Sequence, residues 1–193
     1  LSPPQVIKMS VAEAQAFARK HRSPLLVVSL GALVKSVGED GGDPVLRLLH
    51  DGTHGVEMAQ KIRVRDQARC PSAPDAKRWL RAMAAEGQVG MGLGVDIEDA
   101  HRTLLIKEAH WALQACKSDI EPDAVYLNTV GTFGVASISY WWNRAAAAML
   151  RLLHYMAEGL PATLWAMVFA DDFLIAMMGP GFTQSLLAAL WFL

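Results

Sequence analysis

The spacing of apolar and polar positions along the chain predicts short strands interspersed with helices. β-branched and aromatic residues recur with few polar interruptions in the strand candidates, which are residues 25–30, 45–50, 125–130, 163–169 and 173–178. Apolar residues recur at helical spacing in residues 14–19, 75–86, 139–158 and 183–193. Ser10 and Glu13 predict a capping box before the first helix. Helices and strands follow one another irregularly, so the expected fold class is α+β.

Glycine, proline and short polar residues separate these elements. Turns or loops are expected at residues 38–44, 51–55 and 71–74. Residues 87–94 are also rich in glycine, with the pattern Gly90-x-Gly92-x-Gly94. This pattern lacks the spacing of the dinucleotide-binding fingerprint and of the P-loop. We therefore expect a flexible approach to a strand rather than a phosphate-binding loop.

The composition is that of a folded chain. Its 193 residues are 52% hydrophobic and 19% charged, which predicts one domain, or two subdomains that share a core. The net charge is −1, without the basic surplus that is usual in nucleic-acid-binding proteins. Residues 61–82 are nevertheless locally basic, and only Asp66 and Asp75 oppose their Lys and Arg side chains. This strip predicts either a contact with a phosphate backbone or an ordinary solvated face.

The cysteines and the hydropathy of the chain indicate the cellular compartment in which we expect the protein. Cys70 and Cys116 are far apart and lack metal-ligand spacing, which predicts free thiols in a reducing, intracellular compartment, the cytoplasm or the nucleus. Asp171 and Asp172 interrupt the apolar run 164–170, and a membrane span needs about 20 apolar residues. No membrane partner is therefore expected. The chain starts without methionine and ends in an apolar stretch, so we expect an internal fragment of a longer protein.

The candidate chemistry lies in three acids. Asp171 and Asp172 stand between two apolar strand candidates, so a hairpin would project them at its tip. Adjacent carboxylates repel each other unless a cation neutralises them, and hard oxygen ligands suit Mg²⁺. Asp96 follows another apolar segment and would lie at the end of a strand. Beside the hairpin tip, it would add a third carboxylate to the pair. Two ions held by these acids would activate a 3′ hydroxyl and stabilise a leaving pyrophosphate. The alternative for each acid is a solvated surface turn.

Four segments occur in the order of the motifs of reverse transcriptases. Phe169-Ala170-Asp171-Asp172 resembles the aromatic-x-Asp-Asp box of the third palm motif. Residues 95–100 resemble the first palm motif, and residues 132–137 resemble the second. Arg47 precedes Asp51 by four positions, as in the fingers motif. Over about residues 45–178, the sequence resembles the reverse transcriptases of retrotransposon-type elements.

The resemblance implies a polymerase palm, with an antiparallel sheet and packed helices, at residues 91–193, truncated before the thumb. Residues 1–90 would be a partial fingers region. The implied catalytic residues and ligands of two Mg²⁺ ions, or of Mn²⁺, are Asp96, Asp171 and Asp172. The residues implied to contact the nucleotide are Arg47, Ile97, His101, Phe133 and Gly134. Lys35 is the candidate for a fingers lysine.

Several positions depart from the family pattern. His101 falls where the family often has Tyr or Phe, the residue that blocks a ribose 2′ hydroxyl, so sugar selection is in doubt. Thr132 and Ser139 replace prolines of the second palm motif, and Glu57 stands where an asparagine often closes the fingers motif. Such changes are compatible with a decayed copy of an element, although the three acids are retained.

The sequence therefore predicts a fragment of an RNA-directed DNA polymerase. Because the thumb is missing, we expect the isolated fragment to be inactive even if its parent protein is active. Its partners would be an RNA or DNA template with a primer, together with deoxynucleoside triphosphates. One alternative is a catalytically inactive relic or nucleic-acid-binding module, and another is a metal-dependent hydrolase that uses the same acids. A membrane-associated helical protein is suggested only by the positive mean hydropathy. No feature of the sequence indicates an oligomeric state.

Overall fold

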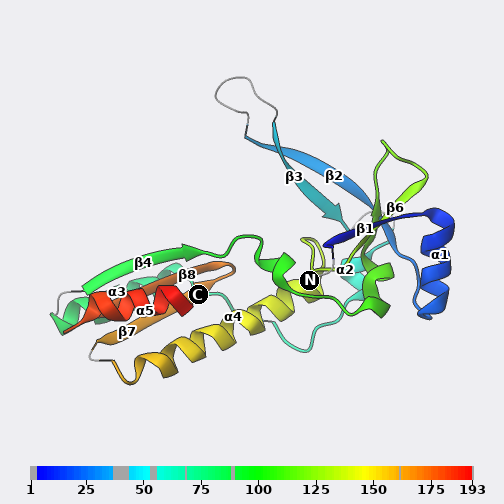
Figure 1. The fold of residues 1–193 in the computed structure, drawn as a ribbon. Coiled ribbons are helices and arrows are strands. Elements are labelled where there is room, and N and C mark those ends of the chain that lie inside the picture. Colours follow the sequence, from blue (N-terminus) through cyan, green and yellow to red (C-terminus); the bar gives the residue numbers. More distant parts are fainter. Residues whose placement is uncertain are drawn as a thin grey trace. The chain divides into compact units, whose positions relative to one another are not determined.

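The computed structural model describes residues 4–36, 44–52, 56–67, 69–87, 90–160 and 162–192. Within these residues the chain has the mixed helix and strand content of the expected α+β class, with five α-helices and two separate sheets (Figure 1). It divides into two compact units. Unit 1 consists of residues 1–65 and 101–141, and unit 2 consists of residues 66–100 and 142–193. The expected boundary between fingers and palm near residue 90 remains a prediction.

Unit 1 contains a five-stranded sheet. Its strand order is β1 (Val6–Ser10), β6 (Ala124–Asn128), β5 (Ala115–Lys117), β2 (Val27–Ser36) and β3 (Val45–Asp51). Neighbouring strands are antiparallel except for β2 and β5, which are parallel. The strands β2 and β3 form a long hairpin that extends away from the rest of unit 1 (Figure 1). Most of the turn expected at 38–44, and part of the loop expected at 51–55, fall outside the described residues.

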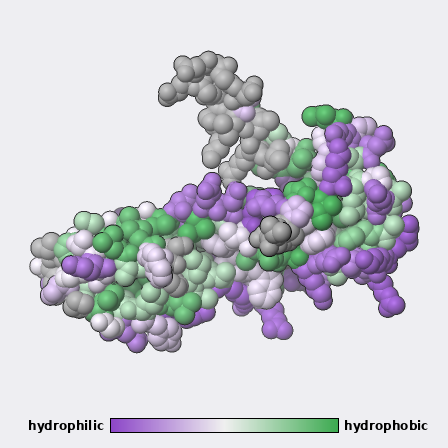
Figure 2. Space-filling model, in the orientation of Figure 1, coloured by the Kyte–Doolittle hydropathy of each residue, from purple (hydrophilic) through white to green (hydrophobic). Residues whose placement is uncertain are grey.

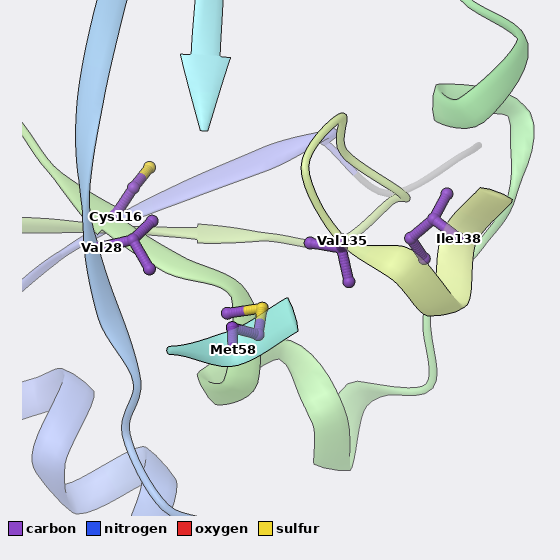
Figure 3. Close-up of a cluster of buried hydrophobic side chains, with 5 residues drawn as sticks. All are labelled: Val28, Met58, Cys116, Val135 and Ile138. Atoms are coloured by element: carbon purple, nitrogen blue, oxygen red, sulfur yellow. The ribbon is translucent and has the colours of Figure 1, made fainter. Parts of the chain in front are cut away.

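Short helices pack against this sheet and form two apolar clusters. The helix α1 (Val11–Lys20) begins at Ser10, whose hydroxyl and backbone N–H form the expected capping box with Glu13. Ala14 of α1 is fully buried against β5 and β6. The second cluster consists of Val28, Met58, Cys116, Val135 and Ile138 (Figure 3). Three short helical segments complete the unit: α2 (Met58–Lys61), η1 (Ala100–Thr103) and η2 (Glu108–Gln114).

Unit 2 contains a three-stranded antiparallel sheet. Its strand order is β4 (Gly90–Asp96), β8 (Asp172–Met178) and β7 (Thr163–Phe169). The predicted strands 163–169 and 173–178 are confirmed, and β8 starts one residue earlier than predicted. The helices α3 (Ala73–Glu86) and α5 (Phe182–Phe192) belong to unit 2, whereas α4 (Ala136–Ala157) starts in unit 1 and continues into unit 2. Because β8 lies between the other two strands, it contributes several fully buried side chains, among them Phe173, Ile175 and Met177.

The surface of unit 2 is unusually apolar in places. The helix α5 packs on β8 and β4 through Leu186 and Ala189, but it exposes Leu187, Leu190 and Trp191. In Figure 2 apolar residues gather over the region of α5. Exposed apolar residues at this spacing are typical of a surface that contacts another protein segment. None of the helices within the described ranges has both the length and the hydropathy that crossing a bilayer requires.

Candidate functional site

Two of the three candidate acids lie opposite each other on the sheet of unit 2. The antiparallel register pairs Asp96 of β4 with Asp172 of β8. Residues paired in this way project their side chains on the same face, with Cβ atoms about 4.5–5.5 Å apart. Asp171 precedes β8, and its carbonyl oxygen accepts a hydrogen bond from the Ile97 N–H at 3.2 Å. The backbone therefore brings the three acids to one end of one sheet.

The turn that carries Asp171 is a two-residue hairpin. Phe169 pairs with Asp172, which leaves Ala170 and Asp171 as the connecting residues. Ala170 has a φ of 55°, in a region that glycine adopts more readily than alanine. The indole N–H of Trp142, a residue only 4% exposed, donates to the Ala170 carbonyl oxygen at 2.9 Å. Trp142 therefore supports the turn from inside unit 2.

We expect Ala170→Gly to stabilise the hairpin by about 0.5–1 kcal/mol, because glycine has no Cβ to strain a left-handed backbone. Urea denaturation followed by tryptophan fluorescence measures the free energy of unfolding. The control is Ala166→Gly in β7, which should destabilise the same sheet by a similar amount, because glycine weakens a strand interior. Equal losses of stability for the two variants would show that residue 170 is not strained in solution.

No Lys, Arg or His among the described residues forms an ion pair with the three carboxylates. Asp96 and Asp172 are exposed, Asp171 is half-buried, and none forms an ion pair with another residue that the structure describes. Like charges directly opposite each other destabilise a strand pair, so a bound cation would stabilise this end of the sheet.

The donor type of the three acids fits Mg²⁺ or Mn²⁺, since both ions prefer carboxylate oxygens. In the described part of the chain, however, no three His, Cys, Asp or Glu side chains form a group already placed to hold a metal ion. Joint ligation by Asp96, Asp171 and Asp172 therefore requires rotation of their side chains between staggered rotamers.

The face of β4 that carries Asp96 has little other side-chain cover. Alternate residues of a strand share a face, so Gly90, Gly92 and Gly94 lie on the same side as Asp96. All three glycines are exposed. The sequence predicts a flexible approach here, but residues 90–96 form a strand in unbroken register with β8. The prediction is wrong because backbone pairing to a buried central strand outweighs the low strand propensity of glycine.

In unit 1, two of the residues expected to contact the nucleotide, His101 and Phe133, contact each other. The ring centroids of His101 and Phe133 are 4.6 Å apart, and the rings are tilted by 55°. His101 is 9% exposed, and its Nε2 lies 3.2 Å from the Ser139 hydroxyl oxygen. The imidazole is therefore fixed by contacts within unit 1, and only a small part of its edge is open to a sugar.

The loop that contains Phe133 passes very close to two other backbone segments. At Gly134, where φ is 87°, an added Cβ would lie 2.4 Å from the carbonyl oxygen of His50. At Gly131, an added Cβ would lie 2.4 Å from the carbonyl oxygen of His101. These approaches require glycine at both positions. His50 itself is buried, and burial lowers the pKa of its imidazole, so the neutral form is favoured.

The other two expected nucleotide contacts lie in different units. Arg47 is paired with Leu33 in the β2–β3 hairpin of unit 1, and Lys35 lies near the end of β2. Ile97 lies in unit 2, where its N–H is already bonded to the Asp171 carbonyl. The Ile97 N–H therefore stabilises the turn that carries Asp171. The resemblance implies that Ile97 contacts the nucleotide.

Both acids of the basic strip, Asp66 and Asp75, form ion pairs inside unit 2. Nη2 of Arg144 lies 3.0 Å from both carboxylate oxygens of Asp66. The carboxylate of Asp75 is 3.8 Å from Arg69 and 3.7 Å from Arg78. By contrast, Lys77 and Arg81 are exposed, four residues apart on α3, and neither forms an ion pair with a described residue. Their spacing puts both on one helix face.

Two comparisons of the sequence, with models of protein families and with curated protein sequences, found no match. The resemblance to reverse transcriptases therefore depends on the four sequence motifs and remains a prediction.

The sequence motifs do not predict the roles of two further residues, Trp142 in unit 2 and Gly131 in unit 1. Trp142 follows the second palm motif, and its position behind the acid-bearing turn becomes visible only in the fold. Gly131 precedes the motif, and its close approach to His101 joins segments that are 30 positions apart. Glycine is common in loops for many reasons, so the sequence alone does not show that Gly131 is required by a close backbone approach.

Proposed function

We propose that this chain is the palm and partial fingers segment of an RNA-directed DNA polymerase. It would add deoxynucleotides to the 3′ end of a primer by metal-assisted phosphoryl transfer. The single observation that carries the proposal is the register that pairs Asp96 with Asp172 and hydrogen-bonds Ile97 to Asp171. Acids from two distant motifs thus meet at one end of one antiparallel sheet, as the two-metal chemistry requires.

The resemblance to reverse transcriptases implies roles for the chain's own residues. Asp96 and Asp171, with Asp172 beside them, would hold two divalent cations. The ions would supply activation of the primer hydroxyl and stabilisation of charge on the leaving pyrophosphate. Arg47 would bind the triphosphate, because the guanidinium fork matches phosphate oxygens. Trp142 would act as a positioning residue, since its hydrogen bond to Ala170 fixes the turn between the strands.

The glycine face of β4 supports this assignment. In a strand interior, glycine often marks a place where a ligand or another backbone approaches closely. Packing explains the glycine at position 90, where a Cβ would lie 2.5 Å from Cγ of Met178. It does not require glycine at position 92, where a Cβ would meet only the Ile175 carbonyl oxygen, at 3.9 Å. We propose that the primer end lies against this bare strip next to Asp96.

We expect Gly92→Val to leave unit 2 as stable as before, or more stable by up to about 1 kcal/mol. The added side chain would nevertheless keep the primer away from the strip, and primer extension should fall by about tenfold to hundredfold. The matched control is Met91→Val, an exposed neighbour that points to the other face of β4. Equal extension rates for the two variants would remove the strip from the proposal.

A second surface of unit 2 is suited to the phosphate backbone. We expect the double variant Lys77→Glu/Arg81→Glu to weaken binding to a primer–template duplex. The slope of log affinity against log salt concentration should become shallower by about 2, one for each phosphate that the variant no longer neutralises. The control is Arg19→Glu/Lys20→Glu on α1, an equal change of charge on exposed residues of unit 1. Identical salt slopes for the two double variants would show that α3 is an ordinary solvated face.

Template-directed extension of a labelled primer tests the function itself. With Mg²⁺, an RNA template and deoxynucleoside triphosphates, the longer parent protein that contains this segment, which is the form for every extension assay, should extend the primer in the order that the template dictates, and Asp171→Asn should abolish this. Phosphate release without a template would instead favour the metal-dependent hydrolase. Isothermal calorimetry separates the inactive relic from the enzyme, because a relic would show no Mg²⁺-dependent binding of deoxynucleotides.

A further inference from the structure

A buried glutamine joins the end of η2 to the segment that precedes the loop of Phe133. Gln114 is only 4% exposed, and its Nε2 donates to the carbonyl oxygens of Asn128, at 3.2 Å, and of Val130, at 3.3 Å. In the opposite direction, Nδ2 of Asn128 donates to the backbone carbonyl oxygen of Gln114 at 2.9 Å. One side chain thus holds two alternate carbonyls directly before residues 131–134, which we call the Phe133 loop.

The two bonds of the Gln114 side chain add little to the stability of unit 1. Only the nitrogen of an amide can donate to carbonyl oxygens, so the side chain has one orientation, and its Oε1 has no hydrogen-bond partner among the described residues. An unpaired buried acceptor costs about as much free energy as two neutral hydrogen bonds gain. The amide therefore matters chiefly for where it holds residues 128–130, and methionine, an apolar side chain of similar length, should change the stability little.

The Phe133 loop has no slack that could absorb a displacement of the segment before it. An added Cβ at Gly131 would lie 2.4 Å from the carbonyl oxygen of His101, and one at Gly134 would lie 2.4 Å from the carbonyl oxygen of His50. Close-packed backbone of this kind transmits a shift rather than damping it. A displacement of residues 128–130 is therefore passed on to Phe133.

We propose that Gln114 is a positioning residue, which holds the Phe133 loop where Phe133 and Gly134 meet the incoming deoxynucleotide. This inference rests on the proposed polymerase function. Gln114 does not touch the nucleotide, and it acts through the two carbonyl oxygens that it binds. If the loop adopted its binding arrangement for only about a tenth of the time, the apparent affinity for the nucleotide would fall about tenfold.

Gln114→Met tests this role, because it removes the donor and keeps a side chain of similar length. In the parent protein, we expect the KM for the deoxynucleotide to rise about tenfold, while kcat stays within about threefold of its original value. In this chain, the Gly131 N–H, which donates to the Leu104 carbonyl oxygen at 2.9 Å, should exchange its hydrogen about tenfold faster, and the amides of β8 in unit 2 should not change. The control Gln60→Met makes the same replacement at an exposed position of unit 1 and should alter neither quantity.

The possible outcomes separate positioning from a merely structural role. A lower urea midpoint of Gln114→Met together with an unchanged KM would overturn the proposal, because the bonds would then serve stability alone. Unchanged exchange at Gly131 would overturn it as well. Absence of template-directed extension by the unaltered parent protein would instead overturn the proposed function, and the exchange measurement would still decide whether Gln114 holds the Phe133 loop.

Discussion

Asp96→Asn is expected to reduce primer extension by about a thousandfold or more while the chain remains folded. Asp96 is exposed, and the substitution leaves in place the backbone hydrogen bond from the Ile97 N–H to the Asp171 carbonyl oxygen, which holds this end of the strand pair. The amide keeps the shape of the side chain but removes one negative charge from the set that would hold the ions. Loss of preorganised charge stabilisation at a reacting phosphate typically costs several kcal/mol of activation free energy.

Two comparisons make this result specific. Glu86→Gln removes an exposed carboxylate at the end of α3 in the same unit, and it should extend primers at the unaltered rate. Urea denaturation of Asp96→Asn should show equal or higher stability, because a repulsion across the strand pair is relieved. Extension at near the original rate in Asp96→Asn would mean that this acid does not take part in the reaction.

Gly134→Ala is expected to destabilise unit 1 by about 3 kcal/mol, one of the largest effects of any single methyl group in this chain. Two causes act together. At a φ of 87° an L-residue is strained, and the Cβ would lie 2.4 Å from the backbone carbonyl oxygen of His50, which cannot move without shifting β3. The free energy of unfolding from urea denaturation measures the loss.

Two other glycines separate these causes. Gly87 has a φ of 62°, but nothing lies within 4 Å of an added Cβ, so Gly87→Ala should lose only about 1 kcal/mol. Gly159 has neither a left-handed φ nor a neighbour within 4 Å, so Gly159→Ala should be neutral or slightly stabilising. A loss for Gly134→Ala no larger than that for Gly87→Ala would show that the loop yields around the new methyl group.

The elements that the sequence predicts best are those whose pattern is local. The hairpin of β7 and β8 follows from two apolar runs that flank a pair of acids, and its bounds are correct to within one residue. The helix α1 follows from the capping box of Ser10 and Glu13, which the structure confirms. In both cases the decisive interactions join residues that are close in the chain, so the pattern is visible without the fold.

The features that the sequence does not predict depend on long-range pairing. The strand β4 has a glycine at alternate positions, and only its partner β8 makes it a strand. The short strands β1 and β5 are defined by their pairing with β6, and neither has a distinctive pattern of its own. Likewise, no local signal shows that Trp142 reaches the carbonyl of Ala170, 28 positions away.

In the candidate site, too, local sequence patterns predict some features, and only the fold shows the others. The acid pair at 171–172 is identified by its immediate neighbours, and the motif order adds Asp96. That Asp96 and Asp172 are direct partners on one sheet is information that only the register supplies. The expected contacts of His101 and Ile97 with a nucleotide compete with contacts that the fold already gives them, to Phe133 and to Asp171.

Electron paramagnetic resonance of Mn²⁺ tests most directly whether Asp96 and Asp172 share a cation. In a titration of the unaltered chain, free Mn²⁺ should be depleted, and Asp96→Asn and Asp172→Asn should each weaken the binding by about tenfold or more. The double variant should be little weaker than either single variant, because both acids would then act through one ion. Independent, additive effects, or unchanged Mn²⁺ binding in all three variants, would contradict a shared metal site at this end of the sheet.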